Sequence, residues 1–249
     1  MKTIATIGII GHGRMGKLFE KMFEPFSDTI FVRIYDRNNF HPQDQFVGFE
    51  SVCDADLIIP CVPIPDFESV IEKMVPHLHA GQTILHICSL QTYPKEILRK
   101  HVPQSVHLIG SHPMFGPQTL AACENSFEGL NFVVDPIFCS DSVFNEVTDF
   151  LRELQFNVIQ MNAEEHDARA AKFHFISHVV ANILTKLELE RTPIDTKSYE
   201  FLFNFLDRID PDPVLMQSML KHNPFAKIEL ERFNESFADI KDILSQSKS

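Results

Sequence analysis

Three glycines near the start of the chain have the spacing of a phosphate-binding turn. The run Gly11-His12-Gly13-Arg14-Met15-Gly16 follows a β-branched segment and precedes a helical pattern. In such a G-x-G-x-x-G motif the first glycine allows a tight turn and the second lets the backbone approach a pyrophosphate. The third lets the helix pack closely on the strand, and the helix N-terminus faces the phosphates. We therefore predict that residues 11–16 bind a dinucleotide.

Asp36 and Arg37 bear on which dinucleotide is bound. Asp36 ends the next predicted strand, twenty residues after Gly16. A carboxylate at this position accepts hydrogen bonds from the ribose hydroxyls and repels the 2′-phosphate of NADP. Arg37 could instead hold that phosphate. The pair predicts NAD as the cofactor, with NADP as the alternative.

A proline-rich loop follows the third predicted strand, at Cys61-Val62-Pro63-Ile64-Pro65. Ligands of open α/β sheets lie outside the carboxyl ends of the strands. Val62 and Pro63 are therefore expected near the ribose on the nicotinamide side of the cofactor. A turn stiffened by proline for structural reasons would have the same sequence.

Two polar clusters follow further predicted strands, at Ile87-Cys88-Ser89-Leu90 and at Gly110-Ser111-His112-Pro113-Met114-Phe115-Gly116-Pro117. A histidine between serine and proline in a loop bounded by glycines is not a usual packing arrangement. The stretch that follows it would stiffen the backbone and hold the imidazole in one place. His112 is thus predicted to be catalytic, since histidine is the commonest acid–base group.

A third cluster opens the second half of the chain. Glu165-His166-Asp167 begins a long helical pattern that also carries His174, Ser177 and His178. At about 100° per residue, the three histidines fall within about 120° of one another and share a broad face. No carboxylate or cysteine completes a metal site there, so a polar pocket without metal is favoured. The alternative for each histidine is an ordinary hydrogen-bonded position.

The predicted site residues before position 160 must be positioned by the alternating strands and helices of residues 1–160. Predicted strands cover Thr3–Ile9, Ile30–Tyr35, Leu57–Cys61, Thr83–Ile87, Val106–Ile109, Phe132–Val134 and Asn157–Gln160. Predicted helices cover Met15–Phe23, Phe67–His79, Pro94–His101 and Ser142–Leu154. The alternation predicts an α/β fold, a Rossmann-type doubly wound parallel sheet with helices on both faces.

Residues 161–249 are predicted to form an all-helical domain for substrate binding and dimerisation. Residues 163–190 keep an apolar stripe at helical spacing without a break, and two or three further helices follow. The turns between them are marked by Pro193, by Asp210-Pro211-Asp212-Pro213 and by Asn223-Pro224. The apolar faces of these helices need partner surfaces, and a homodimer through this domain would supply one.

The amino-acid composition limits the classes of partner that the protein is expected to bind. The 249 residues are 44% hydrophobic and carry a formal net charge of −12. This acidic balance argues against nucleic acids and anionic membranes, and no apolar run is long enough to span a bilayer. An anionic substrate would need a few basic residues that reverse the sign locally. The five cysteines contain no C-x-x-C pair, which favours reduced thiols in a cytoplasmic protein.

The motif at residues 110–117 resembles the signature loop of the prephenate/arogenate dehydrogenase family of tyrosine biosynthesis. The second half resembles the plant-type arogenate dehydrogenases at residues 165–178 and 190–200, at Asn223-Pro224 and near Phe237. The resemblance extends from the glycine motif nearly to the C-terminus. The loop and the helical pattern are specific to the family, whereas the glycine motif is shared by many families.

This resemblance implies oxidative decarboxylation of a small-molecule substrate, arogenate to tyrosine or prephenate to 4-hydroxyphenylpyruvate. A hydride leaves the carbon that bears the 4-hydroxyl group for NAD, and the ring carboxylate leaves as CO₂ while the ring aromatises. By family match, His112 accepts a hydrogen bond from that hydroxyl, aided by Ser89. The substrate-binding residues would be His174, Ser177, His178, Thr196 and Lys197.

The chain departs from the family pattern in several places. The arginine with which many bacterial members hold the substrate carboxylate has no match, so that task falls on Lys197. Plant-type members usually have glutamine at the place of His174 and serine-arginine at the place of Asp36-Arg37. The usual Ser-Val-Lys is here Ser89-Leu90-Gln91.

Asp212 bears on the choice of substrate. By resemblance it takes the place of an acidic residue that favours arogenate in plant-type enzymes, where a carboxylate could pair with the substrate ammonium. An aspartate in an Asp-Pro-Asp-Pro corner is equally natural as a turn former. Arogenate is slightly favoured over prephenate.

Two other functions fit parts of the sequence. A hydride-transfer enzyme of the β-hydroxyacid dehydrogenase type would use a catalytic lysine on the helical domain and would lack the loop at 110–117. A non-catalytic NAD-binding regulator would keep Gly11–Gly16 without needing His112.

Overall fold

The computed structural model describes residues 4–38, 45–124, 126–209 and 212–246. It divides into two compact units, Met1–Ala163 and Glu164–Ser249. Thr3, where the first strand was predicted to begin, and Asp210-Pro211 of the predicted turn lie outside the described residues.

The first unit is built on a seven-stranded sheet with the order β2-β1-β3-β4-β5-β6-β7. Strands β1 to β5 run parallel, β6 is antiparallel to β5, and β7 is parallel to β6. The strands are β1 (Thr6–Ile10), β2 (Phe31–Tyr35), β3 (Leu57–Pro60), β4 (Thr83–His86), β5 (His107–Pro113), β6 (Asn131–Phe138) and β7 (Asn157–Gln160). The predicted Rossmann-type, mainly parallel sheet is confirmed. Because β1 lies between β2 and β3, the strand order reverses there, and such a switch point is where ligands bind in open α/β sheets.

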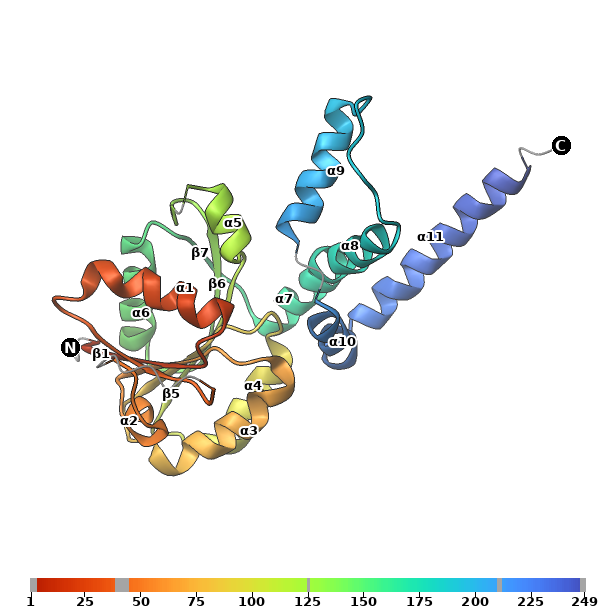
Figure 1. The fold of residues 1–249 in the computed structure, drawn as a ribbon. Coiled ribbons are helices and arrows are strands. Elements are labelled where there is room, and N and C mark those ends of the chain that lie inside the picture. Colours follow the sequence, from red (N-terminus) through yellow and green to blue (C-terminus); the bar gives the residue numbers. More distant parts are fainter. Residues whose placement is uncertain (1–3, 39–44, 125, 210–211, 247–249) are drawn as a thin grey trace. The chain divides into compact units, whose positions relative to one another are not determined.

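Helices cover both faces of this sheet, as predicted (Figure 1). One face carries α1 (Arg14–Phe23), α5 (Pro117–Ala122) and α6 (Asp141–Glu153), and the other carries α2 (Phe49–Cys53), α3 (Ile64–Met74) and α4 (Thr92–His101). The core under α1 and α6 contains the fully buried rings of Phe19 and Phe132. The short helices α2 and α5 were not predicted.

The second unit is all-helical within the described residues, as predicted. It contains α7 (Ala163–Ala170), a π-helical turn (Ala171–Phe175), α8 (Ile176–Lys186), α9 (Lys197–Arg208), α10 (Pro213–His222) and α11 (Ala226–Gln246), where α7 begins on the last residue of the first unit. The helical segment predicted over 163–190 is continuous from Ala163 to Lys186, with the π turn as one turn within it. It ends earlier than predicted because Glu188 takes a left-handed conformation with φ of 50°, a common way to end a helix.

A search of the described residues finds no helix that is both long and apolar enough to cross a membrane.

Glycine at position 16 is required by the close packing of α1 on β1. A Cβ atom on Gly16 would lie 2.0 Å from the carbonyl oxygen of Gly11, far inside van der Waals contact. The clash is with backbone, which cannot move away without shifting the strand end. This is the helix-to-strand contact that the third glycine of the motif was predicted to make.

We expect Gly16→Ala to destabilise the protein by at least about 2 kcal/mol, because overpacking against fixed backbone separates the helix from the sheet. Gly48→Ala is the matched control, since a Cβ at Gly48 meets nothing within 4 Å and its φ is −66°. Urea unfolding of both variants measures the effect. Equal stability of Gly16→Ala and Gly48→Ala would contradict this packing.

Candidate functional site

The glycine turn connects the carboxyl end of β1 to the N-terminus of α1. Gly11 has a φ of +99°, a backbone conformation that favours glycine, and a Cβ there would lie 2.5 Å from the carbonyl oxygen of Cys61. A Cβ on Gly13 would meet nothing within 4 Å. The turn is therefore closed toward β3 at Gly11 and open at Gly13, where a phosphate can approach the backbone at the start of α1.

Asp36 is tied to the glycine turn by its carboxylate. One oxygen accepts a hydrogen bond from the backbone N–H of His12 at 2.7 Å, and the other accepts one from the N–H of Asn38 at 2.8 Å. Burial alone would raise the pKa of Asp36, but these two bonds and the nearby charge of Arg37 hold it below its ordinary value. Asp36 is thus an ionised acceptor beside the turn.

His12 and Arg37 have their own partners within the protein. The His12 ring is buried, with Nε2 2.6 Å from a Glu20 carboxylate oxygen and its edge against Phe46. The Arg37 guanidinium lies 3.6 Å from the carboxylate of Asp66 in the first turn of α3. The His12 side chain therefore supports the turn from within, and the charge of Arg37 is partly balanced.

The loop after β3 packs directly on the glycine turn. The Cys61 N–H donates to the carbonyl of Ile10 at 2.7 Å, and Val62 lies against Gly11. The following helix was predicted to start at Phe67 but begins at Ile64, because Pro65 fits in its first turn, where no N–H is needed. Val62 and Pro63 thus lie beside the turn at the sheet edge, while their contact with a ribose stays a prediction.

His112 lies within a strand, so its placement in a loop was wrong. The strand predicted to end at Ile109 continues to Pro113, because β6 runs antiparallel beside it and supplies hydrogen-bonding partners, with His112 opposite Val133. Strand pairing, rather than the proline-containing stretch, therefore fixes the backbone of His112. The side chain is 5% exposed.

Ser89 and His112 are brought together at one edge of the sheet. Ser89 follows the carboxyl end of β4, and His112 lies near the carboxyl end of the parallel neighbour β5. The Ser111 hydroxyl donates to the His86 carbonyl at 2.7 Å and joins the two strand ends. Gln91, noted in the sequence only as a departure from the family's Ser-Val-Lys, also belongs to this region, because its buried amide contacts both strand ends.

In the helical unit the predicted histidines do come together. The rings of His174 and His178 meet edge to face with centroids 4.9 Å apart, and His166 lies near enough to influence His174 electrostatically. His174 belongs to the π turn, a feature that often occurs at functional sites. Burial, with the neighbouring histidines, lowers the pKa of His174 to about 3, and burial also lowers the pKa of His178.

His166 is anchored at the base of this cluster. Its Nδ1 lies 2.9 Å from a carboxylate oxygen of the fully buried Asp167, whose carbonyl accepts a hydrogen bond from Asn223. Asp212 caps the N-terminus of α10 by accepting a hydrogen bond from Leu215. It also acts electrostatically on His178. Asp212 therefore does form the turn before α10, and its side chain also lies near His178.

The remaining substrate-binding candidates are more exposed. Ser177 is partly exposed in the first turn of α8, and Thr196 is the exposed residue before α9. The Lys197 side chain is 88% exposed and pairs with Glu200 at 3.0 Å. The helical unit thus gathers the histidines and Asp212 but does not itself gather Thr196 and Lys197 with them in a buried setting.

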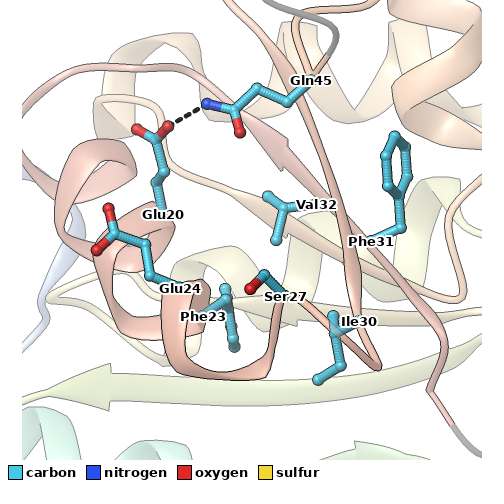
Figure 2. Close-up of a pocket in the computed structure, with 8 residues that line it drawn as sticks. All are labelled: Glu20, Phe23, Glu24, Ser27, Ile30, Phe31, Val32 and Gln45. Atoms are coloured by element: carbon cyan, nitrogen blue, oxygen red, sulfur yellow. Dashed lines mark hydrogen bonds between the residues drawn. The ribbon is translucent and has the colours of Figure 1, made fainter.

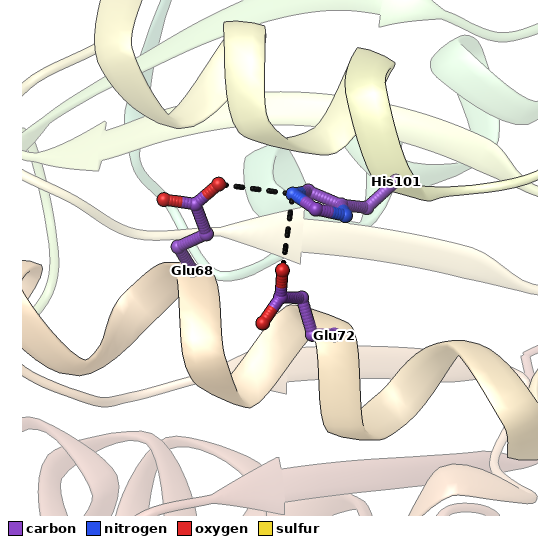
Figure 3. Close-up of side chains that lie close together, drawn as sticks. All are labelled: Glu68, Glu72 and His101. Atoms are coloured by element: carbon purple, nitrogen blue, oxygen red, sulfur yellow. Dashed lines mark hydrogen bonds and ion pairs between the residues drawn. The ribbon is translucent and has the colours of Figure 1, made fainter.

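A group of metal-type side chains lies elsewhere in the first unit (Figure 3). Within the described residues, Glu68 and Glu72 on α3 and His101 on α4 bring one ligand atom each to within 4.8 Å of one another. Glu68 already pairs with Lys100 at 2.8 Å and with His101 at 3.0 Å. These ion pairs between two neighbouring helices explain the cluster without a metal ion.

A depression of about 610 Å³ lies beside α1 and the start of β2 (Figure 2). Its walls include Glu20, Glu24, Phe31 and Gln45, with Glu20 hydrogen-bonded to Gln45. It extends from the N-terminal end of β2 to Glu20, whose carboxylate contacts the His12 ring of the glycine turn. None of the predicted site residues lines it.

Comparison with known proteins gives family matches in both halves of the chain. The family described as "Prephenate dehydrogenase, nucleotide-binding domain" matches residues 37–160, and "TYRAAT1-like, C-terminal domain" matches residues 183–249. The chain belongs to the prephenate dehydrogenase family. Its predicted likeness to the plant-type members is also confirmed, because 94% of the chain aligns at 30% identity with arogenate dehydrogenase 1, chloroplastic, of Arabidopsis thaliana.

The relatives are longer than the matched region. The chain spans 38% of that Arabidopsis protein and 68% of arogenate dehydrogenase 2, chloroplastic, which is 26% identical over 94% of the chain. The Aquifex aeolicus prephenate dehydrogenase structure, in complex with hydroxyphenyl propionate and NAD+, has a TM-score of 0.75 at 17% identity over 98% of this chain and 92% of that one. The Synechocystis arogenate dehydrogenase structure gives 0.68 at 17% identity, over 98% and 93%. At such identities these structures confirm the fold.

The lowered pKa of the half-buried His174 predicts a pH-dependent stability. Its folded pKa of about 3 lies below the ordinary value of 6.5, so between these values the unfolded chain binds more protons at this residue. Stability from the neutral His174 is fully present above about pH 6.5 and is lost as pH falls, by up to about 1.4 kcal/mol per pH unit. We expect His174→Gln to show a flatter free energy of unfolding between about pH 4 and 6, measured by urea titration. Equal slopes in both proteins would contradict a neutral His174.

Proposed function

We propose that this chain is a NAD-dependent dehydrogenase that oxidises and decarboxylates arogenate or prephenate. The observation that carries the proposal is the order of groups along the carboxyl edge of the sheet. Asp36 follows β2, the glycine turn follows β1, Val62 follows β3, Ser89 follows β4, and His112 lies near the end of β5. A dinucleotide with its adenosine ribose at Asp36 and its pyrophosphate at Gly13 would have its nicotinamide directed toward Ser89 and His112.

The chain's own residues would orient the substrate and accept its proton. NAD+ supplies the hydride acceptor when bound. The paired, buried strand holding His112 keeps its imidazole where it can accept a hydrogen bond from the substrate's 4-hydroxyl and take the proton as the ring oxygen becomes a carbonyl. When the C–C bond to the carboxylate breaks, CO₂ leaves and the bond's electron pair moves through the ring to that oxygen. The oxygen then takes the proton back from His112 and becomes a phenol hydroxyl, and the gain of aromaticity drives the reaction. His174, Ser177 and His178 would contact the ring, and Thr196 and Lys197 would hold its carboxylate groups.

The charges around Asp36 favour NAD over NADP. The lowered pKa of Asp36 keeps a negative charge where the 2′-phosphate of NADP would lie. Arg37, which could balance that phosphate, lies beside Asp66 instead. Structural neighbours in this family include one solved with NAD+.

Arogenate is slightly favoured over prephenate as the substrate. Asp212 lies near His178, and a carboxylate at this place could pair with the ammonium that arogenate carries and prephenate lacks. Its capping of α10 uses one of its oxygens in the bond to Leu215.

We propose that the protein is located in the cytoplasm, and the oxidation state of its cysteines supports this. All five are free thiols, and burial raises the pKa of Cys53 to about 12 and raises the pKa of Cys88. Protonated, buried thiols are suited to a reducing compartment.

The activity is tested with purified protein, NAD+ or NADP+, and arogenate or prephenate, by following NADH absorbance and the aromatic product. We expect turnover with NAD+, and His112→Asn should lower kcat by a factor of about 10² or more because the proton acceptor is lost. His107→Asn, at the other end of the same strand, is the matched control and should keep activity. No product from the unchanged protein would contradict the enzyme, and an active His112→Asn would contradict the role of His112.

We also propose that the chain forms a homodimer through the helical unit. On α11 the apolar residues recur at alternating spacings of four and three, which is the pattern of a helix–helix seam. They are Ala226, Leu230, Phe233, Phe237, Ile240 and Leu244. Ala226 is buried, whereas Phe237, Ile240 and Leu244 are 60%, 54% and 63% exposed, so the stripe continues past the surface that its own unit covers.

Light scattering should give a mass of about twice 28.6 kDa for the unchanged protein. Ile240→Glu should shift it to the monomer, because a charge in an apolar seam opposes association. Glu235→Gln, a change at an exposed polar position of the same helix, should leave the dimer intact. A monomer mass for the protein without substitutions would contradict the proposed dimer.

A further inference from the structure

Gln91 is a buried amide at the junction of β4 and α4. It is 1% exposed and directly precedes the first residue of α4. Its Nε2 atom lies 2.9 Å from the carbonyl oxygen of Cys88, 3.1 Å from that of Leu90 and 2.9 Å from that of Ser111. One side chain thus donates to backbone in both the β4–α4 connection and strand β5.

The carbonyls that Gln91 contacts belong to particular peptide groups. The Cys88 carbonyl is part of the peptide that joins Cys88 to Ser89, and the Ser111 carbonyl is part of the peptide that joins Ser111 to His112. The amide therefore contacts the backbone immediately before each of the two predicted catalytic residues. Its two N–H groups set the spacing between those two peptides.

The neighbouring strand β5 leaves space for the Gln91 side chain at Gly110. A Cβ on Gly110 would lie 2.8 Å from the Gln91 Oε1 atom and 2.9 Å from the His86 Nε2 atom. The first glycine of the motif at 110–117 therefore leaves room for the side chains that join β4 to β5. The Ser111 hydroxyl adds a second bond between the strands, to the carbonyl of His86 at 2.7 Å.

We propose that Gln91 is a positioning residue that holds Ser89 and His112 at their working separation. This inference rests on the proposed dehydrogenase function, because the positioned groups are the ones assigned to the reaction. Gln91 does not touch the reacting atoms; it acts through the two peptide groups. Its loss should therefore reduce the rate of the chemical step more than the affinity for cofactor.

The test uses Gln91→Met, which has a similar shape but no N–H donor, and Gln91→Lys, whose ammonium offers three donors to the three carbonyls. We expect Gln91→Met to lower kcat at least 10-fold while the Kd for NAD+ changes less than 2-fold, and Gln91→Lys to recover part of the loss. If Gln91→Met does not fold, Gln91→Asn, whose shorter amide cannot reach both peptides, is judged by the same criteria.

Gln82 is the matched control at the other end of β4. It is also buried, and its Nε2 donates to the carbonyls of Cys53 and Ala55 at 2.8 Å each. Gln82→Met should lower the melting temperature while kcat per folded enzyme stays within 2-fold. The proposal is overturned if Gln91→Met keeps kcat within 3-fold, if its NAD+ affinity falls in parallel with kcat, or if Gln91→Lys is no better than Gln91→Met.

A measurement without turnover separates this proposal from the proposed function. The Cε1–H NMR signal of His112, assigned by its absence in His112→Asn, should move in Gln91→Met and stay in place in Gln82→Met. If the unchanged protein oxidises neither substrate, the proposed function fails, and this signal still decides whether Gln91 positions His112. An unmoved His112 signal in Gln91→Met would overturn the positioning role.

Discussion

The close approach of backbone to backbone at the end of β1 is the constraint on which the nucleotide half depends. Gly11 faces the carbonyl of Cys61, Gly16 faces the carbonyl of Gly11, and a Cβ on Gly8 would lie 2.3 Å from the carbonyl of Val52. At each of these contacts a side chain would push a helix or a neighbouring strand away from β1. Because these glycines have no side chains, α1, α2 and the loop after β3 can pack closely on β1. The N-terminus of α1 and the ionised Asp36 are then held together.

The nucleotide-binding half could largely be predicted because its signals are local. The glycine spacing and the position of Asp36 depend on backbone conformation within short segments. The length of β5 could not be predicted in the same way. Gly110 and Pro113 are poor strand residues, and they extend the strand only because β6 lies antiparallel beside it, which is a non-local contact. The short helices α2 and α5 lack the length that makes periodicity visible.

The proximity of the candidate histidines could be predicted from their spacing, but the local structure that carries them could not. The spacing of His166, His174 and His178 indicated a shared face, and the rings of His174 and His178 do meet. The π turn that carries His174 has no simple sequence signal, since it alters only one turn of an otherwise helical pattern. Gln91 could be recognised in the sequence only as a departure from the family's Ser-Val-Lys, because its contacts are with three backbone carbonyls that only the folded chain brings around it.

On this arrangement, one sheet edge orients a dinucleotide so that its nicotinamide lies beside Ser89 and His112. A crystal structure of the protein with bound NAD+ tests this most directly. We expect the pyrophosphate over Gly13 at the N-terminus of α1, the adenosine ribose against Asp36, and the nicotinamide ring next to His112 with space for a six-membered ring. A nicotinamide bound away from β4 and β5, or a His112 ring turned away from it, would contradict the account.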